Sequence, residues 1–173
     1  MRKRVEIPGE RIFVFKIIRS NYYGMVRGNP YRVLAVPEDF TLHQFAEAIN
    51  ESFGFAFDHA FGFYSNLTRY RSSDEGYELF ADDPDERWIE IDTRFGSVKK
   101  TRVNQVFTQL KKKMLYLFDY GAEWHFRVEL IKIEPFLVWK PYLACIKSVG
   151  KAPQQYDVPD KQEELRRIDE DDK

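Results

Sequence analysis

The sequence predicts an α+β fold in a single domain, with a mainly antiparallel sheet and helices packed on one face. Three observations lead to this prediction. Several short segments are rich in β-branched and aromatic residues, which favour strands. The predicted order of elements, β-β-α-β followed by a short strand, a short helix and a hairpin, lacks the strict βαβα alternation of parallel folds. The 173 residues suit one domain, and 43% hydrophobic and 16% aromatic residues are enough for a core.

The middle of the sheet is predicted in residues 114–135. Met114–Phe118 is apolar at every position, as expected for a strand covered on both faces. A tight turn, Asp119–Glu123, separates it from a second strand with strict alternation, in which the odd-numbered residues are polar. The inward residues of that strand are Phe126, Val128 and Leu130, and the outward ones are His125, Arg127 and Glu129.

Two further strands are predicted near the amino terminus. Arg11–Arg19 is apolar and β-branched or aromatic at almost every position, which predicts a central strand. Tyr31–Val36 is the second strand, and Pro37 ends it because proline has no ladder donor. The turn-forming residues between them favour an antiparallel pair.

A helix follows, with its start, apolar face and end all marked. Thr41 and Gln44 have the spacing of a capping box, and Phe40 and Phe45 stand at the staple positions. Gly54 supplies the left-handed end. The apolar stripe consists of Leu42, Phe45, Ala46, Ile49 and Phe53.

The remaining elements are shorter. Alternation predicts a strand at Phe57–Tyr64, and an acidic loop insertion follows that does not have the glycine and glutamate spacing of an EF-hand. Helical spacing over Val103–Leu110, with Thr101 as a cap, places Lys111–Lys113 at the negative end of the helix dipole. Further short strands are predicted at Tyr77–Phe80 and Trp88–Asp92, and irregular packing at Phe136–Ala144.

We expect the folded domain to cover residues 1–153 and an acidic, flexible tail to cover 154–173. This tail holds eight acidic and four basic residues, so the net charge of −1 divides into a mildly basic body and an acidic end. One cysteine, Cys145, and no apolar run long enough for a signal peptide or a membrane helix predict a cytoplasmic protein without a membrane partner.

Three segments together resemble the plasmid pRiA4b ORF-three-like family, small α+β proteins of undefined biochemical activity. The first segment runs from Val36–Leu42 to Asp58-His59 and Phe61. It is similar to the family's pattern of a proline after a strand, a helix that starts with Thr-Leu, and a histidine after a Phe-Gly-aromatic step. Tyr116–Gly121 with Trp124 resembles its Tyr-x-Tyr-Asp-Phe-Gly-Asp-x-Trp signature. The third segment comprises Pro141, Cys145, Gly150 and Ala152-Pro153, and it is similar to the Cys-Gly-Pro segment near the family's C-terminus.

The resemblance spans about Arg11 to Pro153 and departs from the family pattern at two places. Ala122-Glu123 replaces the usual Asp followed by a variable residue, so a carboxylate is lost or moved by one position. Gln154–Asp157 stands where the family has an acidic pair and glycines. Some relatives lie beside or are fused to mobile-element proteins, which links the family to nucleic acid by association.

The strongest functional hypothesis is a non-catalytic interaction module for an unknown protein or small-molecule partner, without a cofactor or metal. Its binding surface would use exposed aromatic and acidic side chains at the tip of the hairpin. For His59 alone, the favoured interpretation is a hydrogen-bonded core histidine, and Trp124 has a competing interpretation as a core residue. The candidate site consists of Asp58, His59, Asp119, Tyr120, Glu123, Trp124 and His125.

Two alternatives remain open. A hydrolase would use His59 and His125 as acid and base, with Asp58, Asp119 or Glu123 as orienting or metal-binding carboxylates. A nucleophilic Cys145–His–Asp set is also conceivable. A nucleic-acid-associated protein would use basic and aromatic side chains. The basic candidates are Arg69, Arg71, Lys99, Lys100, Arg102 and Lys111–Lys113.

Overall fold

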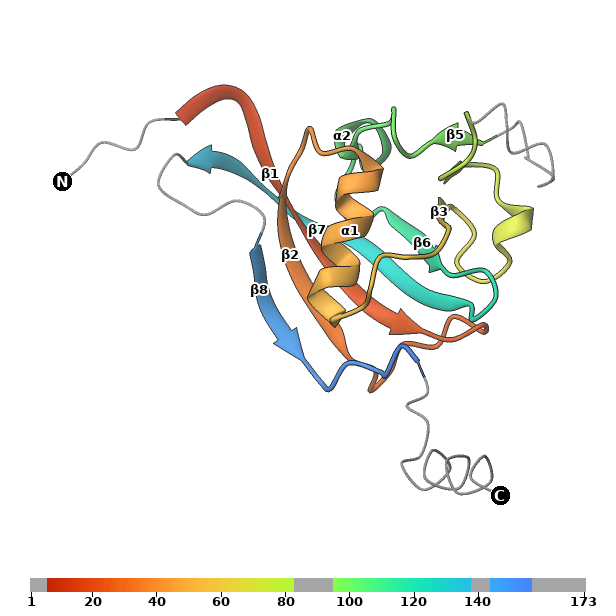
Figure 1. Cartoon of the computed structure of the whole chain (residues 1–173). Helices are drawn as coiled ribbons and strands as arrows, with labels where there is room; N and C mark the ends of the chain where they lie inside the picture. Colours follow the sequence, from red (N-terminus) through yellow and green to blue (C-terminus); the bar gives the residue numbers. More distant parts are fainter. Residues whose placement is uncertain (1–5, 83–94, 138–143, 157–173) are drawn as a thin grey trace, which may run out of the picture.

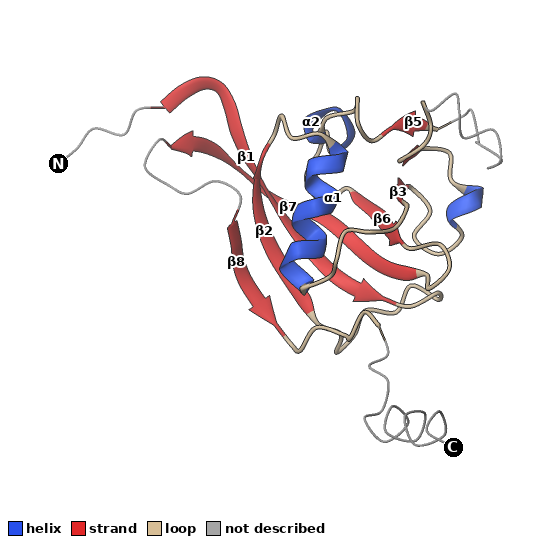
Figure 2. Ribbon diagram, in the orientation of Figure 1, coloured by secondary structure: helices blue, strands red, loops and turns tan. Residues whose placement is uncertain are grey.

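The computed structural model of the protein describes residues 6–82, 95–137 and 144–156. It forms one eight-stranded sheet with a helix lying across one of its faces (Figures 1 and 2). The strands are β1 (Glu6–Ser20), β2 (Tyr31–Pro37), β3 (Phe61–Tyr64), β4 (Gly76–Glu78), β5 (Gly96–Ser97), β6 (Lys113–Phe118), β7 (Trp124–Leu137) and β8 (Ala144–Val149). The helices are α1 (Leu42–Phe53), α2 (Val103–Val106) and a 3-10 turn, Tyr70–Ser72.

The strand order is β5-β4-β3-β6-β7-β1-β2-β8, so the β6–β7 hairpin lies in the middle of the sheet, as the sequence predicts. All neighbouring pairs are antiparallel except β4–β5. The prediction of an α+β fold with a mainly antiparallel sheet is therefore confirmed. Helices α1 and α2 share one face, whereas Tyr70 of the 3-10 turn packs on the other.

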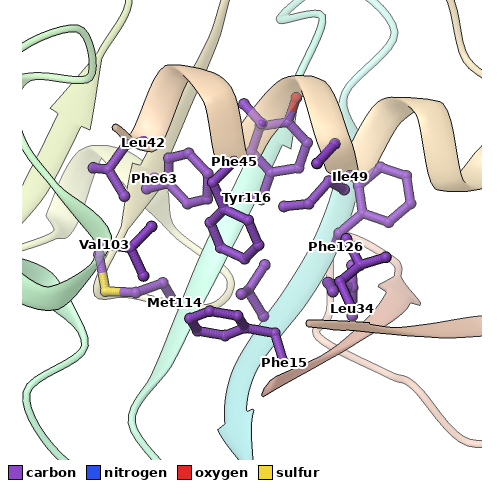
Figure 3. Packing of buried hydrophobic residues seen from close by; sticks show 14 of the residues in the cluster. Phe15, Leu34, Leu42, Phe45, Ile49, Phe63, Val103, Met114, Tyr116 and Phe126 are labelled. Carbon is purple, nitrogen blue, oxygen red and sulfur yellow. The ribbon is translucent and has the colours of Figure 1, made fainter. Parts of the chain in front are cut away.

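The main core lies between α1 and the sheet (Figure 3). Phe45 projects from the helix toward Phe15 of β1 and Phe63 of β3, with ring centroids 4.5 and 5.9 Å away. Each of these three side chains is fully buried. Burial of this apolar stripe holds the helix on the sheet, because helix propensity alone contributes little in a segment of twelve residues.

Both ends of α1 agree with the sequence prediction. The Thr41 hydroxyl accepts a hydrogen bond from the Gln44 backbone N–H, and the Gln44 side chain accepts one from the Thr41 N–H. Gly54 adopts φ +71°, the left-handed conformation that ends the helix.

The register of β6 and β7 decides which side chains share a face. Phe118 pairs with Trp124, and both pack on the side of α1. Leu117 pairs with His125, and both point to the opposite side, where Leu117 joins a second apolar cluster. The prediction that the His125 side is exposed to solvent is wrong at this residue, since His125 is only 2% exposed.

The second helix is shorter than its apolar spacing predicts. Helix α2 ends at Val106, its N-cap is Arg102 instead of Thr101, and Leu110 is exposed. The helix end therefore does not explain Lys111–Lys113. These lysines lead into β6, and Lys112 forms an ion pair with Glu75 at 2.8 Å.

Other predicted boundaries shift. Only the second half of Phe57–Tyr64 is a strand, β4 begins one residue earlier than expected, and Phe136 continues β7. Strand β8 is absent from the sequence prediction, which expected irregular packing up to Ala144. The predicted strand Trp88–Asp92 lies outside the described residues.

Residues 154–156 belong to the described chain although the predicted domain ends at Pro153, and residues 157–173 lie outside it. In the ranges that the structure describes, none of the helices has the length and apolarity needed to cross a bilayer.

Candidate functional site

The pairing of β3 with β6 brings two distant parts of the chain together. Asp58 and His59 lie in the loop between α1 and β3, and Asp119 lies at the first position after β6. Phe61 pairs with Phe118, and the Asp119 backbone N–H donates to the Ala60 carbonyl at 2.9 Å. The loop and the hairpin turn therefore meet at one end of the sheet.

His59 lies between two carboxylates at this meeting point. Its Nδ1 donates a hydrogen bond to Asp58 Oδ1 at 2.8 Å, and its Nε2 lies 3.7 Å from Asp119 Oδ2. The ring rests edge-on against Phe118, with centroids 6.1 Å apart. The side chain is 41% exposed, so the interpretation as a core histidine is wrong.

Gln155 and Tyr156, which follow Pro153 in the sequence, complete the arrangement. The Tyr156 hydroxyl donates to Asp58 Oδ2 at 2.5 Å and lies 3.5 Å from His59 Nδ1. The Gln155 side chain bonds both backbone groups of Ala56, at 2.6 and 3.1 Å. The chain past β8 is thereby fastened to the loop that carries His59. We call Asp58, His59, Asp119 and Tyr156 the hairpin-end cluster.

Asp119 is oriented by its own turn. Its Oδ1 accepts hydrogen bonds from the backbone N–H groups of Gly121 and Ala122, at 3.0 and 3.2 Å. Its φ of +56° lies in the left-handed region, which aspartate tolerates better than most residues because its short side chain bonds the local backbone. These bonds leave Oδ2 facing His59.

The charges of the cluster reinforce one another. The hydrogen bond with Asp58 raises the pKa of the His59 imidazole above its ordinary value of 6.5, and Asp119 acts in the same direction. The hydrogen bonds from Tyr156 and His59 lower the pKa of Asp58. The Asp58 carboxylate in turn raises the pKa of Tyr156 to about 12. The cluster thus combines two carboxylates and a phenol with an imidazole whose protonated form these neighbours favour.

The other predicted site residues do not join this cluster. Trp124 packs partly buried against the main core, with its ring 5.0 Å from Phe55. Tyr120 lies on the opposite face, where its hydroxyl bonds Tyr64 at 2.6 Å. The expectation of two exposed aromatic side chains at the hairpin tip is therefore wrong. Glu123 is exposed in the turn.

The structure also separates the two histidines proposed for a hydrolase. His125 points to the sheet face opposite α1, whereas His59 contacts Phe118 on the face of α1. Cys145 pairs with Leu34 in the edge strand β8, at the other side of the sheet from β3. A His59–His125 acid and base pair is therefore not assembled.

We predict that NMR titration will separate these histidines. Burial lowers the pKa of His125 below 6.5, whereas the carboxylates raise that of His59. Protonated His59 therefore stabilises the fold at low pH, and this contribution is lost as pH rises through its folded pKa. Buried neutral His125 has the opposite effect, so its contribution is lost as pH falls below the ordinary value. Asp58→Asn should lower the titration midpoint of His59 and leave that of His125 in place. A wild-type protein in which His59 titrates at a lower pH than His125 would contradict the prediction.

Gln155 and Tyr156 were missed by the sequence prediction, which assigned them to the tail. The available signal was an aromatic residue three positions after Pro153, where the chain departs from the family pattern. Within the described ranges, histidine, cysteine and acidic side chains form no group of three or more suited to a metal ion.

Part of the basic stripe proposed for nucleic acid is paired with nearby acids. Lys100 forms an ion pair with Asp82 at 2.9 Å, and Lys113 approaches Glu129 at 4.0 Å. Arg102 donates to the Asp39 backbone carbonyl at 2.9 Å and lies 3.8 Å from its carboxylate. These pairs reduce the field that a phosphate backbone would meet at this surface.

Comparison with known proteins supports the fold and the family. No curated protein matches the sequence. A crystal structure of the protein of unknown function MM3350 from Methanosarcina mazei Go1 superimposes with a TM-score of 0.64 at 20% identity, covering 84% of this chain and 73% of that chain. The family model described as plasmid pRiA4b ORF-3-like protein matches residues 26–162. The chain therefore belongs to the plasmid pRiA4b ORF-3-like protein family.

Proposed function

We propose that this protein is a non-catalytic binding module whose hairpin-end cluster recognises a basic segment of a partner protein. The observation that carries the proposal is the position of His59 between Asp58 and Asp119. Both ring nitrogens face carboxylate oxygens, which favour the cationic form of the imidazole. His125, the second histidine of the hydrolase alternative, lies on the opposite face of the sheet, so no acid and base pair forms beside His59.

The same arrangement suits recognition. The cluster carries two carboxylates beside one imidazole, and Glu123 adds another exposed carboxylate in the adjacent turn. Asp58 and His59 side chains are 47% and 41% exposed, and Tyr156 offers an aromatic edge beside them. Arginine or lysine side chains complement this combination, because they pair with carboxylates and pack on aromatic rings.

The existing hydrogen bonds lower the cost of binding. Tyr156 and His59 fix the Asp58 carboxylate, and two backbone N–H groups fix Asp119. Side chains already ordered before a partner arrives lose less conformational entropy on association. A guanidinium approaching from solvent would meet carboxylates at settled positions.

Titration with a short peptide of alternating arginine and glycine tests the proposal. Chemical-shift changes in labelled protein are expected at the amides of the hairpin-end cluster, and Asp58→Asn should weaken binding about threefold to tenfold because a charge-assisted contact is lost. Glu47→Gln on the exposed side of α1 is the matched control, since it also removes one carboxylate. Equal weakening in both variants, or shifts centred elsewhere, would reject the cluster as the binding site.

A further inference from the structure

A second surface lies on the face of the sheet opposite α1. A groove with a volume of about 480 Å³ runs over β1, β2, β7 and β8. Val14, Val33 and Ile146 supply apolar lining, and Lys16, Lys132 and Lys147 supply the cations. Val14 and Val33 belong to an apolar cluster separate from the core beneath α1. The groove is thus independent of the hairpin-end cluster.

Two of these lysines converge on one aromatic ring. Lys16 Nζ lies 4.4 Å from the centroid of Tyr31, and Lys147 Nζ lies 5.7 Å from the same centroid. Lys132 is neutralised by an ion pair with Glu134. Among the residues that the structure describes, no carboxylate lies within ion-pair distance of Lys16 or Lys147. Within the described ranges Lys16 and Lys147 thus form no ion pair, although Glu134 also lines the groove and Glu129 stands opposite Lys16 in the β1–β7 pairing.

Exposed aromatic residues extend this surface along the sheet. Ile18 pairs with Tyr31 on one side and with Arg127 on the other, and Ser20 pairs with His125. Because alternate residues share a face, Tyr31 and His125 lie on the same side of the sheet. The ring centroids of Tyr22 and His125 lie 6.2 Å apart. The neighbouring Tyr23, which is 77% exposed, packs edge-on against the Tyr22 ring.

We propose that this face binds single-stranded nucleic acid. Lys16 and Lys147 would contact backbone phosphates, and the apolar lining of the groove would receive the planar faces of bases. Tyr22 and Tyr23 would stack further bases where the strand leaves the groove. Basic side chains interleaved with aromatic ones form the usual surface for single strands, since the phosphates need cations and every base has a π-face.

The alternatives fit the surface less well. A duplex hides its base faces, so the exposed tyrosines and the apolar lining would be unused. An acidic peptide would satisfy Lys16 and Lys147, but it has no planar groups for Tyr22 and Tyr23. Ile146, which is 59% exposed at the rim, shows that the groove is shallow there, as suits a polymer that enters and leaves.

Fluorescence anisotropy with labelled oligo-uridine of about 12 nucleotides tests the proposal, because this length lies within the usual site sizes for single strands. The double variant Lys16→Gln/Lys147→Gln should bind about tenfold more weakly in low salt. The slope of log K against log salt should become shallower by about 1.4, since each phosphate contact on a single strand contributes about 0.7. Tyr23→Ser should weaken binding about threefold with little change in that slope, because stacking carries no charge.

The matched control is Lys99→Gln/Lys100→Gln, which removes two exposed lysines next to β5, the strand at the opposite edge of the sheet from β8. It should keep at least half of the wild-type affinity. Unchanged binding by the groove variant, or an equal loss in the control, would overturn the proposal. A wild-type protein that does not bind oligo-uridine would also overturn the proposal. If that protein instead bound a labelled peptide of alternating glutamate and alanine, the groove would be a site for acidic peptides. Thermal unfolding of each variant, together with the single variant Lys147→Gln, separates loss of contact from loss of fold.

Discussion

Phe45→Ala is expected to lower the free energy of unfolding by roughly 3–5 kcal/mol. Phe45 is fully buried, and its ring lies 4.5 Å from that of Phe15 and 6.3 Å from that of Phe107. Removing the ring loses its burial and leaves a cavity between α1 and the sheet that the neighbouring rings cannot fill without moving. The surrounding aromatic side chains are themselves packed, so little relaxation is expected.

Urea denaturation followed by circular dichroism measures this effect. Glu47→Ala is the control, since Glu47 lies two residues further along, on the exposed side of the same helix. It should change stability by less than about 0.5 kcal/mol. A loss of less than about 1 kcal/mol in Phe45→Ala would mean that this face of α1 is not seated on the sheet as described.

Gly62→Ala is expected to destabilise the protein by about 1–3 kcal/mol. A methyl group on Gly62 would lie 2.6 Å from the Tyr64 hydroxyl oxygen and 2.9 Å from that of Tyr120. Tyr64 is fully buried and donates to Glu78 at 2.7 Å, so it cannot move without disturbing that bond. The glycine is needed here for space, not for backbone conformation.

The same denaturation measurement applies, with Gly121→Ala as the control. A methyl group there would meet only Asp119 Oδ1 within 4 Å, at 3.3 Å. We expect that variant to lose less than half as much stability as Gly62→Ala. If Gly62→Ala were as stable as the wild type, the close tyrosine pair over β3 would not exist in solution.

The sequence predicts an element well where several local signals agree. For α1, the Thr41–Gln44 capping box, the apolar stripe and Gly54 all specify the same helix, and the structure contains it. The β6–β7 hairpin is similar, because alternation and a turn coincide. Helix α2 shows the limit: the spacing through Leu110 is helical, yet the chain leaves the helix after Val106 to reach the start of β6.

Elements that depend on distant partners are harder to predict. The residues of β8 described with side chains are all exposed, so no apolar alternation marks this strand, which forms by pairing with β2. His59 shares the parity of Phe61 and Phe63, but the strand begins only at Phe61. Tyr156 reaches Asp58 from almost a hundred residues away, and no local pattern encodes such a contact.

The pairing of β1 with β7 has a consequence for how the chain is made. Ile17 pairs with Val128, over a hundred positions further along. Protein synthesis must therefore deliver most of the polypeptide before the first strand gains its neighbour on that side. Until then the apolar residues of β1 and β2 lack much of their eventual cover, and folding that relies on such non-local closure is slow. Nascent chains of this protein should accordingly need chaperone protection for longer than helical proteins of the same size.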